Sequence, residues 1–145
     1  SRQNLPFIER SKEQIELIEK GGYLLSFDDK ADITLISSGS EVKLIIEAAK
    51  TIAKEGLKAN VVSMPCLDKF VSQDKAYRDS IIKPKIPKLV VEALHPNSWY
   101  CLVNLNDVVI GMETFGESAP GDELMNEFGF TVNNIVTQAK KLTAK

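Results

Sequence analysis

A strand–loop–helix–strand unit that starts at Ile33 constrains the fold of this chain more than any other feature. The run Ile33-Thr34-Leu35-Ile36-Ser37 is short, apolar and β-branched, which is typical of a strand buried on both faces. After the loop Ser38-Gly39-Ser40, apolar residues recur with the period of an amphipathic helix, which we expect to have Ser40 as its N-cap and to end at Gly56. A second strand at 58–64 completes a β-α-β unit, which implies parallel strands.

The segments around this unit extend it into a layered α/β fold. The run Tyr23–Ser26 is separated from the unit only by a polar turn, so we expect a hairpin-like, antiparallel strand at or near a sheet edge. Further elements are predicted as strands at 88–94 and 107–112, helical segments at 67–82, 97–102 and 122–128, and a final helix capped by Thr131. The alternation predicts a three-layer sandwich whose five-stranded sheet is mostly parallel, with one antiparallel edge-type strand.

Composition narrows the classes of function. The 145 residues carry 20 acidic and 18 basic side chains, a net charge of −2, so we expect no nucleic-acid binding. No apolar run approaches the roughly 20 residues of a membrane span, so no membrane segment is expected. Cys66 and Cys101 lie in apolar sequence without a CxxC motif or a neighbouring His, which favours reduced, buried thiols over a disulfide or a zinc site.

The loop Ser38-Gly39-Ser40 is the first candidate for ligand binding. It follows a strand and precedes a helix, where backbone N–H groups can bind an anion. It contains neither GxGxxG nor GxxxxGK[ST], so a tight turn with a helix cap is the preferred interpretation.

Three side chains near the fourth strand have unusual positions. His95 follows the strand end, where doubly wound folds place their sites, but Pro96 comes next and no partner base is spaced around it. Glu92 lies inside an apolar strand and is expected to be paired near a sheet edge or to face a polar contact, with no support for a catalytic role. Trp99 is expected in the core or an interface rather than in a stacking platform. These residues form no self-contained active site.

Five segments in order resemble the transketolase family. The leader Ser1-Arg2-Gln3-Asn4-Leu5-Pro6 resembles the junction between the middle and C-terminal domains of transketolases. The other segments are Gly39–Val42 with Glu47–Lys50, Val61–Pro65, Gly111–Pro120 and Phe128–Thr131, in the family's order and with similar spacing. The resemblance implies that residues 1–20 are a leader from the middle-domain junction and that 21–145 form a transketolase C-terminal domain. Residues 94–107 follow no family pattern, which leaves the roles of His95, Trp99 and Cys101 open.

The resemblance implies a function for a longer parent protein. Transketolases are cytoplasmic homodimers of the pentose phosphate pathway that transfer two-carbon ketol units between sugar phosphates, using thiamine diphosphate and a divalent cation, Mg or Ca. The family binds this cofactor between its N-terminal and middle domains, so the present chain is expected to hold no cofactor or metal and to be inactive alone. Arg2 matches the family's arginine that helps to hold the sugar phosphate, although in an isolated piece it would be a solvated charge. No other residue is assigned to the site.

Two alternatives remain at this point. Related thiamine-diphosphate enzymes, such as the pyruvate dehydrogenase β subunit, share the domain architecture, but the SRQNLP and FGESAP motifs favour a transketolase. A stand-alone ligand-binding or regulatory α/β module, with the loop after the Ile33 strand as its anion site, is the rival from another class. The absence of an initial Met and the leader sequence favour a piece of a longer protein over this rival.

Overall fold

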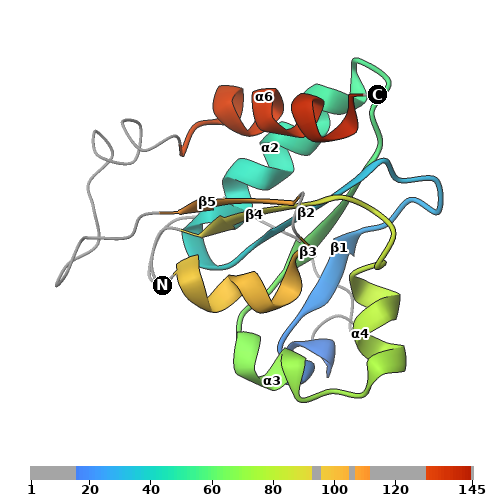
Figure 1. Cartoon of the computed structure of the whole chain (residues 1–145), viewed down its shortest axis with the longest axis vertical. Helices are drawn as coiled ribbons and strands as arrows, with labels where there is room; N and C mark the ends of the chain where they lie inside the picture. Colours follow the sequence, from blue (N-terminus) through green and yellow to red (C-terminus); the bar gives the residue numbers. More distant parts are fainter. Residues whose placement is uncertain (1–15, 93–95, 105–106, 112–129, 145) are drawn as a thin grey trace, which may run out of the picture.

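The computed structural model describes residues 16–92, 96–104, 107–111 and 130–144. Five strands form one sheet in the order β1-β3-β2-β4-β5 (Figure 1). They are β1 Tyr23–Ser26, β2 Ile33–Ser37, β3 Ala59–Ser63, β4 Lys88–Glu92 and β5 Val108–Gly111. Strands β2, β3, β4 and β5 are parallel, whereas β1 is antiparallel to its neighbour β3. The predicted mixed sheet with an antiparallel edge strand is confirmed.

Helices cover both faces of the sheet, as the prediction of three layers requires. On one face, α2 (Val42–Ala53) and α6 (Val132–Thr143) pack side by side (Figure 1). On the other face lie α3 (Leu67–Val71), α4 (Lys75–Ile81) and the 3₁₀-helix η3 (Pro96–Leu102). Two single 3₁₀ turns, η1 (Ile18–Lys20) and η2 (Gly39–Glu41), precede β1 and α2. None of the helices described is long and apolar enough to cross a membrane.

The strand side chains alternate between two hydrophobic cores. Those facing α2 and α6 pack with the buried stripes of both helices, in a cluster that contains Ile33, Leu35, Ile45, Ala48, Ile52, Val61, Leu89, Val91, Ile110, Phe130, Ile135, Val136 and Ala139. Those facing α3, α4 and η3 form a second cluster of Ile36, Val62, Met64, Phe70, Ile81, Ile82, Val90 and Trp99. Each large apolar side chain buried in this way stabilises the fold by about 1.5–3 kcal/mol. All five residues of β2 are buried because both faces of this strand are covered.

The partner of β1 differs from the hairpin-like expectation. β1 pairs with β3 rather than with β2, which follows it in the chain. β2 has no free edge, since β3 and β4 occupy its two sides. The backbone N–H of Asp28 donates to Oδ1 of Asn60 at 2.7 Å, which ties the connection after β1 to β3. The register of β1 with β3 shifts between Leu24 and Ser26, as in a β-bulge.

The helix ends confirm two sequence predictions and contradict one. The hydroxyl of Thr131 accepts a hydrogen bond from the N–H of Asn134 at 3.0 Å and so caps α6 as predicted. Gly56 follows α2 with a φ of +86°, the left-handed conformation expected after a helix. The prediction of Ser40 as N-cap is wrong, because the chain turns through η2 first and Glu41 is the N-cap of α2. The positive φ of Gly39, +59°, allows this early turn.

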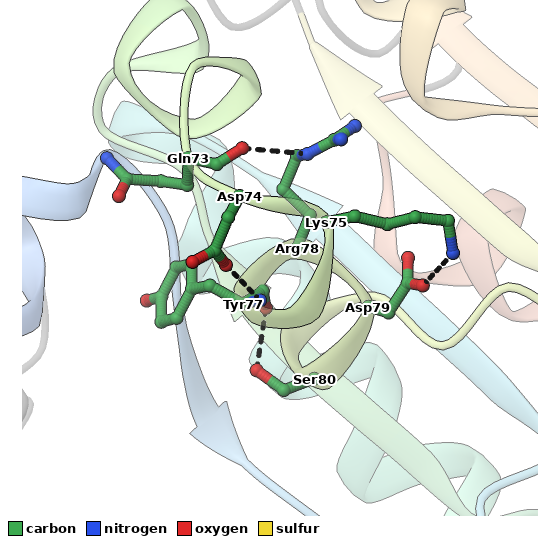
Figure 2. A network of polar contacts seen from close by, with 7 residues as sticks. All are labelled: Gln73, Asp74, Lys75, Tyr77, Arg78, Asp79 and Ser80. Atoms are coloured by element: carbon green, nitrogen blue, oxygen red, sulfur yellow. Dashed lines mark hydrogen bonds and ion pairs between the residues drawn. The ribbon is translucent and has the colours of Figure 1, made fainter.

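The helical region predicted at 67–82 consists of two helices. Asp74 separates them, since its side chain accepts a hydrogen bond from the N–H of Tyr77 at 2.8 Å and caps α4 (Figure 2). The hydroxyl of Tyr77 donates to the carbonyl of Gly22 at 2.7 Å, and burial raises the pKa of this phenol above its usual value of 10.0. α4 is therefore joined to the chain just before β1 across the whole neutral pH range. The helix predicted at 122–128 lies outside the described residues.

Candidate functional site

The carboxyl ends of β2 and β4 are where a sheet of this order would place a ligand. The chain passes from β2 to β3 on one side and then to β4 on the other side of β2, so the direction of winding reverses between β2 and β4. Ligands of open α/β sheets bind outside the strands' carboxyl ends at such a reversal. The loop 38–40 follows β2 there, and Glu92 is the last residue of β4. The topology thus brings together two of the features that the sequence singled out.

A hydrogen bond joins the two strand ends. The hydroxyl of Ser38 donates to Oε1 of Glu92 at 2.7 Å. Glu92 is 7% exposed, and Glu41, at the start of α2, is buried to the same extent. The hydroxyl of Ser37 is fully buried and has no hydrogen-bond partner among the described residues. The expectation that Glu92 faces a polar contact is therefore confirmed, and that contact is Ser38.

Acidic side chains lie on both sides of the loop 38–40. Two buried carboxylates, Glu41 and Glu92, flank the loop whose N–H groups would have to bind the anion. Gly39 has open space where a side chain would stand, so the loop needs this glycine for its turn and not for a close approach to a ligand. The geometry favours the turn and helix start over the anion site.

The described residues do not fit thiamine diphosphate with its divalent cation. Within the described ranges, no group of three or more His, Cys, Asp or Glu side chains is placed to hold a metal ion. The hydroxyl of Ser38, in the loop after β2, donates to the carboxylate of Glu92 and so is already engaged within the protein. The described part of the chain therefore offers no set of ligands for the cation of this cofactor.

The other residues singled out in the sequence have different surroundings. Arg2 and His95 lie outside the described residues. Trp99 is buried in the second core, as expected. Cys66 and Cys101 are free thiols, but the prediction that both are buried is wrong, since Cys66 is half-buried and Cys101 is exposed. η3 is a 3₁₀-helix, in which residues three positions apart lie on the same side. Trp99 and Leu102 therefore both pack into the second core, whereas Cys101, which lies between them in sequence, is on a different side of the helix.

Sequence reasoning missed a buried ion pair at the amino end of β4. The Nζ atom of Lys88 lies 3.7 Å from Oδ2 of Asp107 and donates to the carbonyls of Pro84 at 3.3 Å and Ile86 at 3.1 Å. Asp107 also accepts hydrogen bonds from the N–H groups of Lys88 at 3.0 Å and Asn104 at 2.8 Å. The available signal was a lysine at the start of an apolar strand, which requires a partner when it is buried.

The protein family of this chain follows from a match to a family model. The model of the transketolase-like TK C-terminal domain matches residues 21–131, most of the chain. The chain belongs to the transketolase family. It corresponds to the C-terminal domain of that family, and the predicted family and fold class are both confirmed.

Relatives and solved structures agree with this membership. Transketolase 1 of Vibrio vulnificus (strain YJ016) is 48% identical over 146 residues, which cover 99% of this chain and 22% of that protein. Transketolase 1 of Escherichia coli (strain K12) is 47% identical over 98% of this chain and 22% of its own length. A crystal structure of the Pichia stipitis transketolase in complex with sedoheptulose-7-phosphate superposes with a TM-score of 0.84 at 37% identity, over 99% of this chain and 20% of that one. The chain thus spans about a fifth of the length of these transketolases.

The hydrogen bond between Ser38 and Glu92 is expected to hold the two strand ends together. Ser38→Ala should lower the free energy of unfolding by about 1–2 kcal/mol, because it removes a donor to a buried carboxylate. Ser80→Ala is the matched control, since its hydroxyl donates to the carbonyl of Tyr77 on an exposed helix surface and should change stability by less than about 0.5 kcal/mol. Urea unfolding of both variants measures the difference. Equal losses of unfolding free energy would show that the buried hydrogen bond of Ser38 stabilises the fold no more than the exposed one of Ser80.

Proposed function

We propose that this chain is the C-terminal domain of an active transketolase, which transfers two-carbon ketol units between sugar phosphates in the pentose phosphate pathway. The match of the family model over residues 21–131 carries the proposal. The complex of the Pichia stipitis relative with sedoheptulose-7-phosphate supports sugar phosphates as the substrate class. The whole enzyme would be a cytoplasmic homodimer that uses thiamine diphosphate and a divalent cation, Mg or Ca.

In this proposal residues 1–20 are a leader from the middle-domain junction and 21–145 are the C-terminal domain. The cofactor and its metal are held by the rest of the enzyme. The 145-residue chain alone should then show no saturable binding when thiamine diphosphate and Mg²⁺ are titrated in a calorimeter. Micromolar binding to the isolated chain would contradict this division of roles.

Arg2 is proposed to bind the phosphate of the sugar in the whole enzyme. A guanidinium presents a planar fork of donors that matches phosphate oxygens, and this charge-assisted contact is worth about 1.5–3 kcal/mol. Arg2→Ala should therefore lower kcat/KM for phosphorylated donors by about 10- to 150-fold. The loss should lie mainly in KM, because the phosphate is bound alike in the ground state and the transition state.

Steady-state kinetics of the full-length variant on two kinds of donor test this assignment. Hydroxypyruvate, a donor without phosphate, should react nearly as with the unchanged enzyme, whereas a phosphorylated ketose should show the full loss. Arg2→Lys should recover part of the loss, since it keeps the charge but not the fork. Equal losses on both donors would mean that Arg2 shapes the site in general, and its role in phosphate binding would have to be abandoned.

A further inference from the structure

A concave site lies at the amino end of β4, opposite the strand ends that carry Ser38 and Glu92. It is a cavity of about 150 Å³ between α4, the start of β4 and η3. Its apolar walls include Phe70, Ile82 and Leu102. Its volume equals that of about five water molecules. The cavity is open to solvent at Cys101 and has both polar and apolar walls, so it suits one small organic molecule that carries a polar group.

Among the described residues around this cavity, the charges leave one cation without a counter-ion. Asp79 forms an ion pair with Lys75 (Figure 2). Lys88 forms one with Asp107. Arg78 also lines the cavity. Its Nε donates to the carbonyl of Gln73 at 3.1 Å, and its terminal nitrogens point away from that carbonyl (Figure 2). Within the described part of the chain, these terminal nitrogens have no acceptor.

We propose that this cavity binds a small monocarboxylate, held by Arg78 through its carboxylate and by the apolar walls through a short hydrocarbon body. The guanidinium fork fits the two oxygens of a carboxylate. A phosphate dianion carries one negative charge too many, because Asp79 and Asp107 are already paired with Lys75 and Lys88. Among the described residues that line the cavity, only Arg78 has a positive charge left to match. The apolar walls need a ligand with a few carbon atoms rather than a bare inorganic ion.

The thiol of Cys101 provides a direct measure of what enters the cavity. Cys101 lines the cavity and is exposed to solvent. Its thiolate displaces iodide from iodoacetate or iodoacetamide, so that a C–S bond forms, the C–I bond breaks and the thiol proton passes to the solvent. The two reagents have nearly the same shape, but only iodoacetate carries a carboxylate. The ratio of their rates therefore reports the attraction of the cavity for that group.

The experiment uses the 145-residue chain with Cys66→Ser, which leaves Cys101 as its single thiol. Arg78→Gln should lower the iodoacetate-to-iodoacetamide rate ratio about tenfold. Asp79→Asn should raise the ratio about threefold at low salt, because it removes a negative charge from the same wall. Lys141→Gln is the matched control: it removes an equal charge from α6 on the opposite face and should change the ratio less than about twofold.

Protection by an unreactive ligand completes the test. Butyrate should slow the alkylation of Cys101 by iodoacetamide in a saturable manner, whereas butyramide and inorganic phosphate should not. Circular dichroism shows whether Arg78→Gln is folded; if it is not, the Asp79→Asn ratio and the butyrate protection decide the question. A ratio that Arg78→Gln and Lys141→Gln change equally, or protection by phosphate that exceeds protection by butyrate, would overturn the proposal.

Discussion

Replacing Gly21 by alanine is expected to lower the free energy of unfolding by about 3–5 kcal/mol, enough to unfold a marginally stable domain. Gly21 has a φ of +92°, and a Cβ added there would lie 2.3 Å from the carbonyl oxygen of Cys66 and 2.4 Å from the backbone nitrogen of Phe70. Both contacts are with backbone atoms, so no side chain can rotate away to relieve them. The carbonyl of Gly21 also accepts a hydrogen bond from the N–H of Cys66 at 2.9 Å, which fixes this close crossing.

Gly56→Ala is the matched control for this effect. Gly56 has a similar φ of +86°, but a Cβ there would meet no atom within 4 Å. Only the left-handed backbone should then matter, at about 1–2 kcal/mol. Urea unfolding of both variants, with equal slopes as the check on two-state behaviour, gives the difference. Equal losses for the two variants would show that the chain around Cys66 can move aside.

Asp107→Ala is expected to lower the free energy of unfolding by about 3–5 kcal/mol, because it leaves the ammonium of Lys88 buried without its counter-ion. The side chains of Lys88 and Asp107 are only 4% and 5% exposed. The change also removes the acceptor for the N–H groups of Lys88 and Asn104. Thermal and urea unfolding measure the loss.

The pair of Glu47 and Lys50 is the control, since its N–O distance is also 3.7 Å but its side chains are 51% and 69% exposed. Glu47→Ala should cost less than about 0.5 kcal/mol, because solvent screens an exposed pair. The double variant Lys88→Met/Asp107→Ala should be more stable than Asp107→Ala alone, since it removes the unpaired charge. If the double variant is less stable, packing and not the buried charge determines the loss.

The fold could be predicted from the sequence because each main helix and strand has its own periodic pattern of apolar residues. The five strands, the split into α and β layers and the edge position of Tyr23–Ser26 all follow from local patterns. The pairing of β1 with β3 could not be predicted from local patterns, because it depends on which edge of the sheet is left free once the other strands have paired. The early turn at Gly39 could not be predicted either, since all three residues of the loop Ser38-Gly39-Ser40 are of types that can begin a helix.

The polar contacts could be predicted only in part, for the same physical reason. An acid inside an apolar strand indicated that Glu92 has a polar neighbour, but Ser38 is 54 positions away and is brought close only by the strand order. The carboxylate of Asp107 reaches Lys88 because β4 and β5 are parallel neighbours. Arg78 and Cys101 line one cavity because α4 and η3 cover the same face of the sheet. Assignments of this kind require the topology, which no single segment contains.

The irregular register of β1 has a consequence for how copies of this chain behave at high concentration. β1 has four residues and forms an edge of the sheet, and an edge presents unpaired backbone groups to which another chain can add a strand. The shift between Leu24 and Ser26 twists this edge, and the strand is too short to offer a long, flat template. The fold therefore carries at β1 a built-in protection against the strand-by-strand growth that leads to amyloid-like aggregates.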